Sequence, residues 1–221
     1  TDSFHLSSMS KFILILALSG TIGIILLGGI KRIAHLAEKI VPSMAVLYII
    51  SCLIILIINY NNILSAIGTM FNYAFTHNAL YGGVIGAVIQ GFKRAAFSNE
   101  AGLGSAPIAH AAAKTREPVR EGSIALLEPF IDTIIICFMT GIVIVVTGVY
   151  EGADVNQGGV LLTRNAFATV SSWFPYILSP IVFLFAFSTM LTYSYYGQQA
   201  WLYLTNGKRV YLCHLLFMCF I

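Results

Sequence analysis

Charged residues are scarce in this chain of 221 residues, because Asp, Glu, Lys and Arg together make up only 10% of it. Soluble domains carry about 25% charge, so the deficit excludes an ordinary soluble domain. Hydrophobic residues are abundant instead, at 58%, and the mean hydropathy is +0.85. The net charge of +3 is too small to indicate nucleic-acid binding. The composition therefore predicts an all-α, multi-pass protein of the lipid bilayer.

Cysteine is scarce as well, and catalytic motifs are missing. Cys52, Cys137, Cys213 and Cys219 lie in apolar runs without metal-binding spacing, so we interpret them as buried thiols. No Ser-His-Asp, zinc, phosphate-loop or dinucleotide pattern occurs in a fitting context, which argues against an enzyme and against a bound cofactor. The chain has no initiator Met and stops inside an apolar run, so we expect a fragment of a longer protein.

Long apolar runs predict five membrane spans and a sixth that is cut short. A helix needs about 20 apolar residues to cross the bilayer. The predicted spans are residues 12–30, 40–58, 84–113, 123–150 and 174–204, with the short run at 210–221. Between the second and third spans we expect a loop and an interfacial or partly buried helix. We place Pro42 in the first turn of the second span, where the missing amide costs little.

The distribution of charge orients these spans. Lys and Arg gather in the predicted loops 31–39, 114–122 and 206–209, whereas the predicted loop 151–173 has two acids and one arginine. Because cytoplasmic loops carry an excess of Lys and Arg, we place the three basic loops in the cytoplasm and the acidic loop outside. The first span then runs from outside to inside, and the following spans alternate.

The third predicted span contains FSNEAGLGS, at residues 97–105. An ionisable residue at membrane depth costs about 2.5–3.5 kcal/mol on insertion scales, so Glu100 needs a partner or a cavity. Two glycines allow the backbone to unwind, and a half-helix beginning near Ser105–Pro107, with Ser105 as its cap, would point its positive end at the break. The carbonyl end of the preceding half-helix favours an ammonium group, so the break suits a zwitterion. The alternative is a packing motif, with Glu100 in a cytoplasmic loop and the span at 66–92.

Five charged residues surround this segment. Lys93 and Arg94 must pair with a carboxylate if they lie deep in the membrane, but they fit the positive-inside pattern equally well at its face. The candidate carboxylates are Glu100, Glu128 and Asp132. The last two are four residues apart and share a helix face, where they bind a cation, relay protons or tie the helix to a basic residue. We favour the structural tie.

Residues 185–199, FAFSTMLTYSYYGQQ, set hydroxyl groups into an apolar helix. Hydroxyl and carbonyl oxygens are the ligands that hard cations prefer, so these residues are candidates for a monovalent cation site. Ordinary hydrogen bonding between helices, worth about 0.6 kcal/mol per pair, is the interpretation that the residues alone favour.

Three separated motifs in a fixed order give the chain a specific resemblance. FSNEAGLGSAPIAHAAA (97–113), with GGIKRIAHLAEKIVP (28–42) and FSTMLTYSYYGQQA (187–200), resembles the alanine or glycine:cation symporters, the sodium:alanine symporter family. The resemblance implies sodium-coupled symport of alanine or glycine by alternating access. It also implies the LeuT-type architecture of two inverted five-helix repeats. Residues 1–221 would then be a single transmembrane domain fragment, comprising core helices four to eight and the start of nine, without the N-terminal helices of the same protein.

The resemblance also implies site residues. Phe97, Ser98 and Asn99 would line the amino-acid site, and Thr189 and Tyr193 would face it. Tyr193 stands where relatives commonly have Trp, which leaves selectivity for side-chain size open.

A sodium site follows from the same resemblance. The carbonyl of Phe185 or Ala186 and the hydroxyls of Ser188 and Thr189 would hold sodium as a transported ligand rather than a cofactor. Gln198 stands where relatives commonly have Glu, which leaves open any charge role there. The expected location is the plasma membrane of a prokaryote.

Two alternatives belong to other classes of protein. An ion channel needs a continuous polar stripe, and the single polar break argues against it. An intramembrane enzyme would use Glu100, or Glu128 with Asp132, as acid and base, but it needs a nucleophile or metal ligands that the sequence does not offer.

Overall fold

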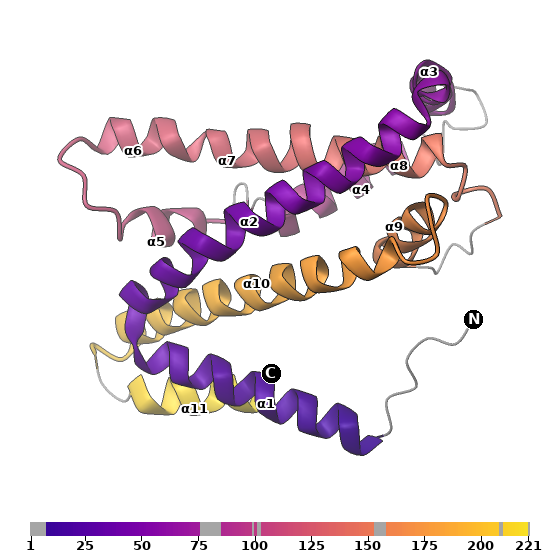
Figure 1. The fold of residues 1–221 in the computed structure, drawn as a ribbon. Helices are drawn as coiled ribbons and strands as arrows, with labels where there is room; N and C mark the ends of the chain where they lie inside the picture. Colours follow the sequence, from indigo (N-terminus) through magenta and orange to yellow (C-terminus); the bar gives the residue numbers. More distant parts are fainter. Residues whose placement is uncertain are drawn as a thin grey trace. The chain divides into compact units, whose positions relative to one another are not determined.

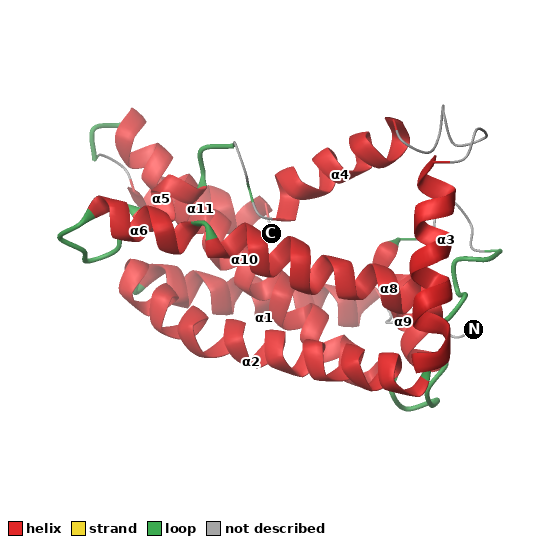
Figure 2. Ribbon diagram, turned by 90° about the horizontal axis from the view of Figure 1, so that it is seen from above, coloured by secondary structure: helices red, strands yellow, loops and turns green. Residues whose placement is uncertain are grey.

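The computed structural model describes residues 8–75, 85–98, 100, 103–152, 158–207 and 210–220, and every regular element in these ranges is a helix (Figure 2). The chain divides into two compact units, which are described separately: Thr1–Met44 with Phe183–Ile221, and Ala45–Val182.

The helices follow the predicted spans in their order along the chain (Figure 1). Their bounds are α1 Ser8–Leu27, α2 Gly29–Ile58, η1 Tyr60–Asn62, α3 Ile63–Phe75, α4 Ile85–Ser98, α5 Ala106–His110, α6 Pro118–Ala125, α7 Leu127–Pro129, η4 Phe130–Cys137, α8 Phe138–Val146, α9 Gly159–Ala168, α10 Pro175–Leu204 and α11 Val210–Phe220. The segment η4 is a π-helix between two α-helical stretches.

Among the described residues, three helical segments are long and apolar enough to cross a membrane: Arg32–Ile58, Pro118–Val146 and Pro175–Leu204. They correspond to the second, fourth and fifth predicted spans. The apolar side chains along the second half of α2, such as Leu53 and Ile57, remain exposed. A lipid tail is as apolar as leucine, so this exposure carries no penalty in a bilayer.

The basic segment 31–39 is not a loop, as predicted, but the beginning of α2. The turn between α1 and α2 is confined to Gly28, and the guanidinium of Arg32 donates a hydrogen bond of 3.1 Å to the carbonyl of Ile24. A basic side chain therefore satisfies one carbonyl near the end of α1. Pro42 consequently lies inside α2 and not in its first turn, so the prediction for that residue is wrong.

Two further predicted loops contain helices. α6 begins at Pro118, inside the predicted loop 114–122, where a proline suits the first turn of a helix. α9 lies inside the predicted loop 151–173. Its Ala166 and Phe167 side chains are completely buried, so this segment belongs to the core of its unit.

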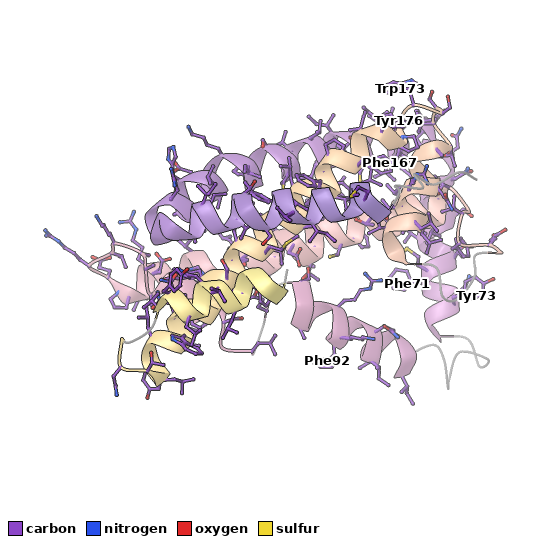
Figure 3. All side chains as sticks on the ribbon, turned by 90° about the horizontal axis from the view of Figure 1, so that it is seen from below. Phe71, Tyr73, Phe92, Phe167, Trp173 and Tyr176 are labelled. Carbon is purple, nitrogen blue, oxygen red and sulfur yellow. The ribbon has the colours of Figure 1, made fainter. Side chains whose placement is uncertain are left out.

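Phe167 is the centre of an aromatic cluster in the unit Ala45–Val182. Its ring lies 6.3 Å from that of Tyr48 on α2 and 5.3 Å from that of Phe174, measured between ring centroids. The Tyr48 hydroxyl in turn lies 2.5 Å from the hydroxyl oxygen of Thr140 on α8. Figure 3 labels Phe167 together with Trp173 at the same end of the unit. The cluster ties α9 to α2 and to the residue that precedes α10.

The other unit is organised by contact between α1 and α11. Ile22 of α1 is fully buried. The short apolar run at the end of the sequence forms α11, so it is helical, as expected. The prediction that the cysteines are buried holds for Cys52, but it is wrong for Cys137, which is exposed.

Candidate functional site

The backbone leaves helical geometry at the predicted place. α4 ends at Ser98 and α5 begins at Ala106, and Glu100 between them has a φ of +55°. A positive φ is uncommon for a residue with a Cβ atom and marks a position that the surrounding structure must hold. The Leu103 amide donates a hydrogen bond of 3.1 Å to the Glu100 carbonyl, which closes a turn. Asn99 and the side chain of Phe97 lie outside the described residues.

The helix after the break is short and lacks the predicted side-chain cap. Ser105 precedes α5 but has helical backbone angles, with φ −78° and ψ −40°. A capping residue normally has extended angles that let its oxygen reach the next amides, so Ser105 cannot cap in this way. Its hydroxyl oxygen is buried and has no hydrogen-bond partner in the described part of the chain. This leaves a polar atom beside the break that a ligand can satisfy.

A hydrogen bond joins the end of α4 to the π-helix η4. The Ser98 hydroxyl donates to the Oδ2 atom of Asp132. The thiol of Cys137 lies beside Ser98 as well. Ser98, a predicted substrate residue, therefore lies in a polar cluster with Asp132, a predicted coupling charge.

Glu128 and Asp132 have separate partners and do not form one acidic site. The Nε2 atom of His110, on α5, lies 3.7 Å from Oε2 of Glu128, and its Nδ1 atom lies 2.8 Å from Oε1 of Glu121. Glu128 lies on α7, before the π-helix begins at Phe130, and Asp132 lies within the π-helix. The segment Pro118–Val146 thus contacts each half of the broken helix through a different carboxylate.

The predicted ion pairs of Lys93 and Arg94 are not observed. Both side chains are exposed, and the contacts within salt-bridge distance among the described residues both involve His110. The Arg94 guanidinium instead lies at the start of α9, 3.4 Å from where a Cβ atom on Gly159 would stand. The sequence did not predict the contact of His110 with Glu121 and Glu128. The three residues lie on three short helices that share no periodic pattern.

The predicted cation ligands on α10 meet at one carbonyl. Ser188 and Thr189 donate hydrogen bonds of 2.9 Å and 2.8 Å from their hydroxyls to the Phe185 carbonyl. Serine and threonine commonly bond in this way inside helices, so the arrangement fits both a cation site and ordinary helix structure. Ala186 is exposed, and the Tyr193 ring lies 5.9 Å from that of Tyr196.

A cavity of about 270 Å³ lies where α3 meets the end of α8. Its polar lining includes Asn62, Ser65, Thr69 and Glu151, and the Tyr150 hydroxyl donates to the Glu151 carboxylate over 3.2 Å. Partial burial and this neighbouring carboxylate raise the pKa of Tyr150. The charge distribution of the sequence predicts that this end of the unit lies outside the cell.

That orientation predicts an asymmetric labelling pattern in the full-length protein. In a variant without native cysteines, a cysteine in place of the exposed Tyr60 should react with a membrane-impermeant maleimide in intact cells. A cysteine in place of Lys114, also exposed, should react only after permeabilisation. The reverse pattern would show that the orientation is inverted.

Long apolar helices, with a left-handed residue where the third predicted span is interrupted, indicate a polytopic membrane protein. The sequence model of the sodium:alanine symporter family matches residues 1–221, and the chain belongs to this family.

Curated relatives agree with this assignment. The chain is 41% identical to an uncharacterized transporter of Haemophilus influenzae, over 98% of the chain and 48% of that protein. It is 43% identical to the sodium/alanine symporter AgcS of Methanococcus maripaludis, over 85% of the chain and 42% of AgcS. It is 35% identical to the probable sodium/glutamine symporter GlnT of Bacillus subtilis, over 95% of the chain and 43% of GlnT.

The chain spans about half the length of these relatives or less. The names of the family and of these relatives are those of symporters and transporters, not of enzymes. The names of these relatives include both alanine and glutamine, so membership of the family leaves the choice of amino acid open.

Proposed function

We propose that the full-length protein uses the sodium gradient to take up a small neutral amino acid, alanine or glycine, across the plasma membrane of a prokaryote. The observation that carries the proposal is the helix break from Ser98 to Ala106, with Glu100 in the left-handed region, in a member of the sodium:alanine symporter family. Interrupted helices place backbone dipoles at the substrate in many secondary transporters.

The break offers two kinds of polar group to a zwitterion. The last carbonyls of α4, a helix of 14 residues, lack partners within the helix and attract an ammonium group. The buried hydroxyl of Ser105 is free to donate to a carboxylate. In this proposal Phe97, Ser98 and Asn99 contact the amino acid, as the resemblance implies.

In this proposal, residues of α10 contact the amino acid and bind sodium. Thr189 and Tyr193 contact the amino acid, as the resemblance implies. The Phe185 or Ala186 carbonyl and the hydroxyls of Ser188 and Thr189 bind sodium, and the meeting of three of these oxygens supports that role. The proposal includes the LeuT-type repeat, with helices outside this chain completing both sites.

Uptake of labelled alanine by the full-length protein tests this function. We expect saturable uptake that falls at least about tenfold when choline replaces sodium, because the coupling free energy is lost with the ion. Unlabelled glycine should compete with labelled alanine. Glutamine is tested as a second candidate substrate, because the relative GlnT is named a probable sodium/glutamine symporter. Uptake that does not saturate would indicate a channel, and saturable uptake that ignores sodium would contradict the proposed coupling.

A further inference from the structure

We propose that the cavity between α3 and the end of α8 binds a small organic cation, an alkylammonium compound, at a site separate from the transported substrates. The cavity has a volume of about 270 Å³, and its described lining residues all belong to the unit Ala45–Val182. None of these residues belongs to the helix break or to the proposed sodium ligands on α10. The cavity therefore lies outside the residues that the proposed function uses.

A polar face of α3 lines this cavity. Asn62, just before α3, and Ser65 and Thr69 follow the spacing of one helix face. Leu64 and Phe71 lie on another face, where they are 81% and 64% exposed. A surface helix normally turns its polar face to bulk water and packs with its apolar face. Here the polar face lies beside α8, against which α3 packs (Figure 1), so the cavity between them calls for water or a polar ligand.

Two of the polar side chains that line the cavity act as hydrogen-bond acceptors. The carboxylate of Glu151 accepts one bond, from the Tyr150 hydroxyl, and has further lone pairs to offer. The Thr147 hydroxyl gives its single proton to the carbonyls of Val143 and Ile144, at 2.8 Å and 3.2 Å. Toward a ligand it can therefore act only as an acceptor. An ammonium group, which only donates, suits both side chains.

The charge around the cavity is negative. Among the described lining residues, Glu151 is charged and the others are neutral. Val145 and Val146 also line the cavity, at the point where the long helical segment Pro118–Val146 ends and the helix dipole is negative. A cation gains from both features. A zwitterionic amino acid would instead bring its carboxylate to a cavity in which no described residue carries a positive charge.

The size and the ligand set favour an organic cation over a metal ion. A volume of about 270 Å³ approaches the range of about 300–1,000 Å³ of small-molecule pockets and far exceeds the space that a bare ion fills. The described residues offer no group of three His, Cys, Asp or Glu side chains that could hold a metal. Ala66, Val145 and Val146 supply apolar contacts for a short alkyl chain beside the polar groups.

Thermal unfolding of the purified full-length protein, titrated with butylammonium chloride, tests for this ligand. Potassium chloride is exchanged for it at constant ionic strength, because sodium is itself a proposed ligand. The melting temperature should rise with the logarithm of concentration above the dissociation constant, as mass action requires. Glu151→Gln should raise this constant about fivefold, the upper contribution of an ion pair between exposed partners.

Two controls accompany this titration. Glu117→Gln, the same change at an exposed carboxylate outside the cavity, should leave the dissociation constant within about twofold of wild type. Potassium butyrate, with the same number of carbons and the opposite charge, should not raise the melting temperature. No stabilisation by butylammonium, an unchanged constant in Glu151→Gln, or stabilisation by butyrate would overturn the proposal.

Thiol labelling tests the charge of the cavity independently. In a full-length variant without native cysteines, Thr69→Cys should react with a cationic ethylammonium methanethiosulfonate at least about tenfold faster than with the anionic ethylsulfonate, relative to a free thiol, because a negative cavity concentrates cations. Ser172→Cys, exposed and outside the cavity, should show no such preference. Butylammonium should protect Thr69→Cys and not Ser172→Cys.

Ser65→Cys, on the same face of α3, is a second reporter with the same expectation should Thr69→Cys fail to fold. Equal rates with the two reagents would show that the cavity is not negative. Absence of reaction with either reagent would show that the rest of the full-length protein fills the cavity. Both results would refute the proposal. Neither experiment measures uptake, so both outcomes are independent of the proposed transport function.

Discussion

Alanine uptake by the full-length protein is expected to fall about tenfold when Glu100 is replaced by valine, and to stay within about twofold of wild type when it is replaced by glycine. Glu100 has a φ of +55°, a conformation that disfavours residues with a Cβ atom and most of all β-branched ones. Glutamate already carries the usual cost of the left-handed region, about 1–2 kcal/mol, so the tenfold effect requires β-branching to add a further penalty of about 1.4 kcal/mol. Glycine has no such penalty.

Glu100→Asn is the matched control, because asparagine tolerates the left-handed region while removing the charge. We expect its initial uptake rate, corrected for surface expression, to resemble that of the glycine variant. Should glycine and asparagine both abolish uptake, the carboxylate of Glu100 would be required, and the backbone explanation would be refuted.

Phe167→Ala should lower the free energy of unfolding by about 3–5 kcal/mol, the usual cost of emptying a site filled by a buried aromatic side chain. Phe167 is 0% exposed and packs against Tyr48 and Phe174. Loss of its ring removes the contacts that tie α9 to α2 and to the residue that precedes α10. Thermal melting of the purified full-length protein, followed by size-exclusion chromatography with fluorescence detection, measures the change.

Phe92→Ala is the control for this experiment. Phe92, on α4, is 75% exposed and stands apart from the aromatic cluster (Figure 3). Substitutions at exposed positions usually change stability by no more than about 0.5 kcal/mol. Equal losses of melting temperature in the two variants would show that α9 is not part of the core.

The end of α4 near residue 99 was predictable because its causes are local, although the residues alone fitted a break within the span and a cytoplasmic loop equally well. Glu100 is an ionisable residue in an apolar run, and the glycines at 102 and 104 allow the chain to turn. Gly104 indeed has a φ of +80°. The failed cap at Ser105 was less predictable, because capping depends on the backbone angles of that residue and not only on its hydroxyl.

The predicted loops were wrong where burial depends on distant partners. Residues 159–168 follow acids and glycines, so they are typical of an external loop, yet Phe167 fills a space bounded by Tyr48 more than 100 positions earlier. The spacing of Glu128 and Asp132 likewise predicts a common helix face, but not which neighbours each acid meets. Neither the π turn at Phe130 nor the different partners of the two acids is encoded in that spacing.

By itself the sequence determined the membrane class, the place of the helix break and the resemblance to sodium:alanine symporters. These properties depend on the transfer free energy of each segment and on motifs that can be read along the chain. Only the tertiary structure decided that Ser98 meets Asp132, that His110 meets Glu121 and Glu128, and that α9 is buried. Such contacts depend on the relative orientation of packed helices, which composition and periodicity do not specify.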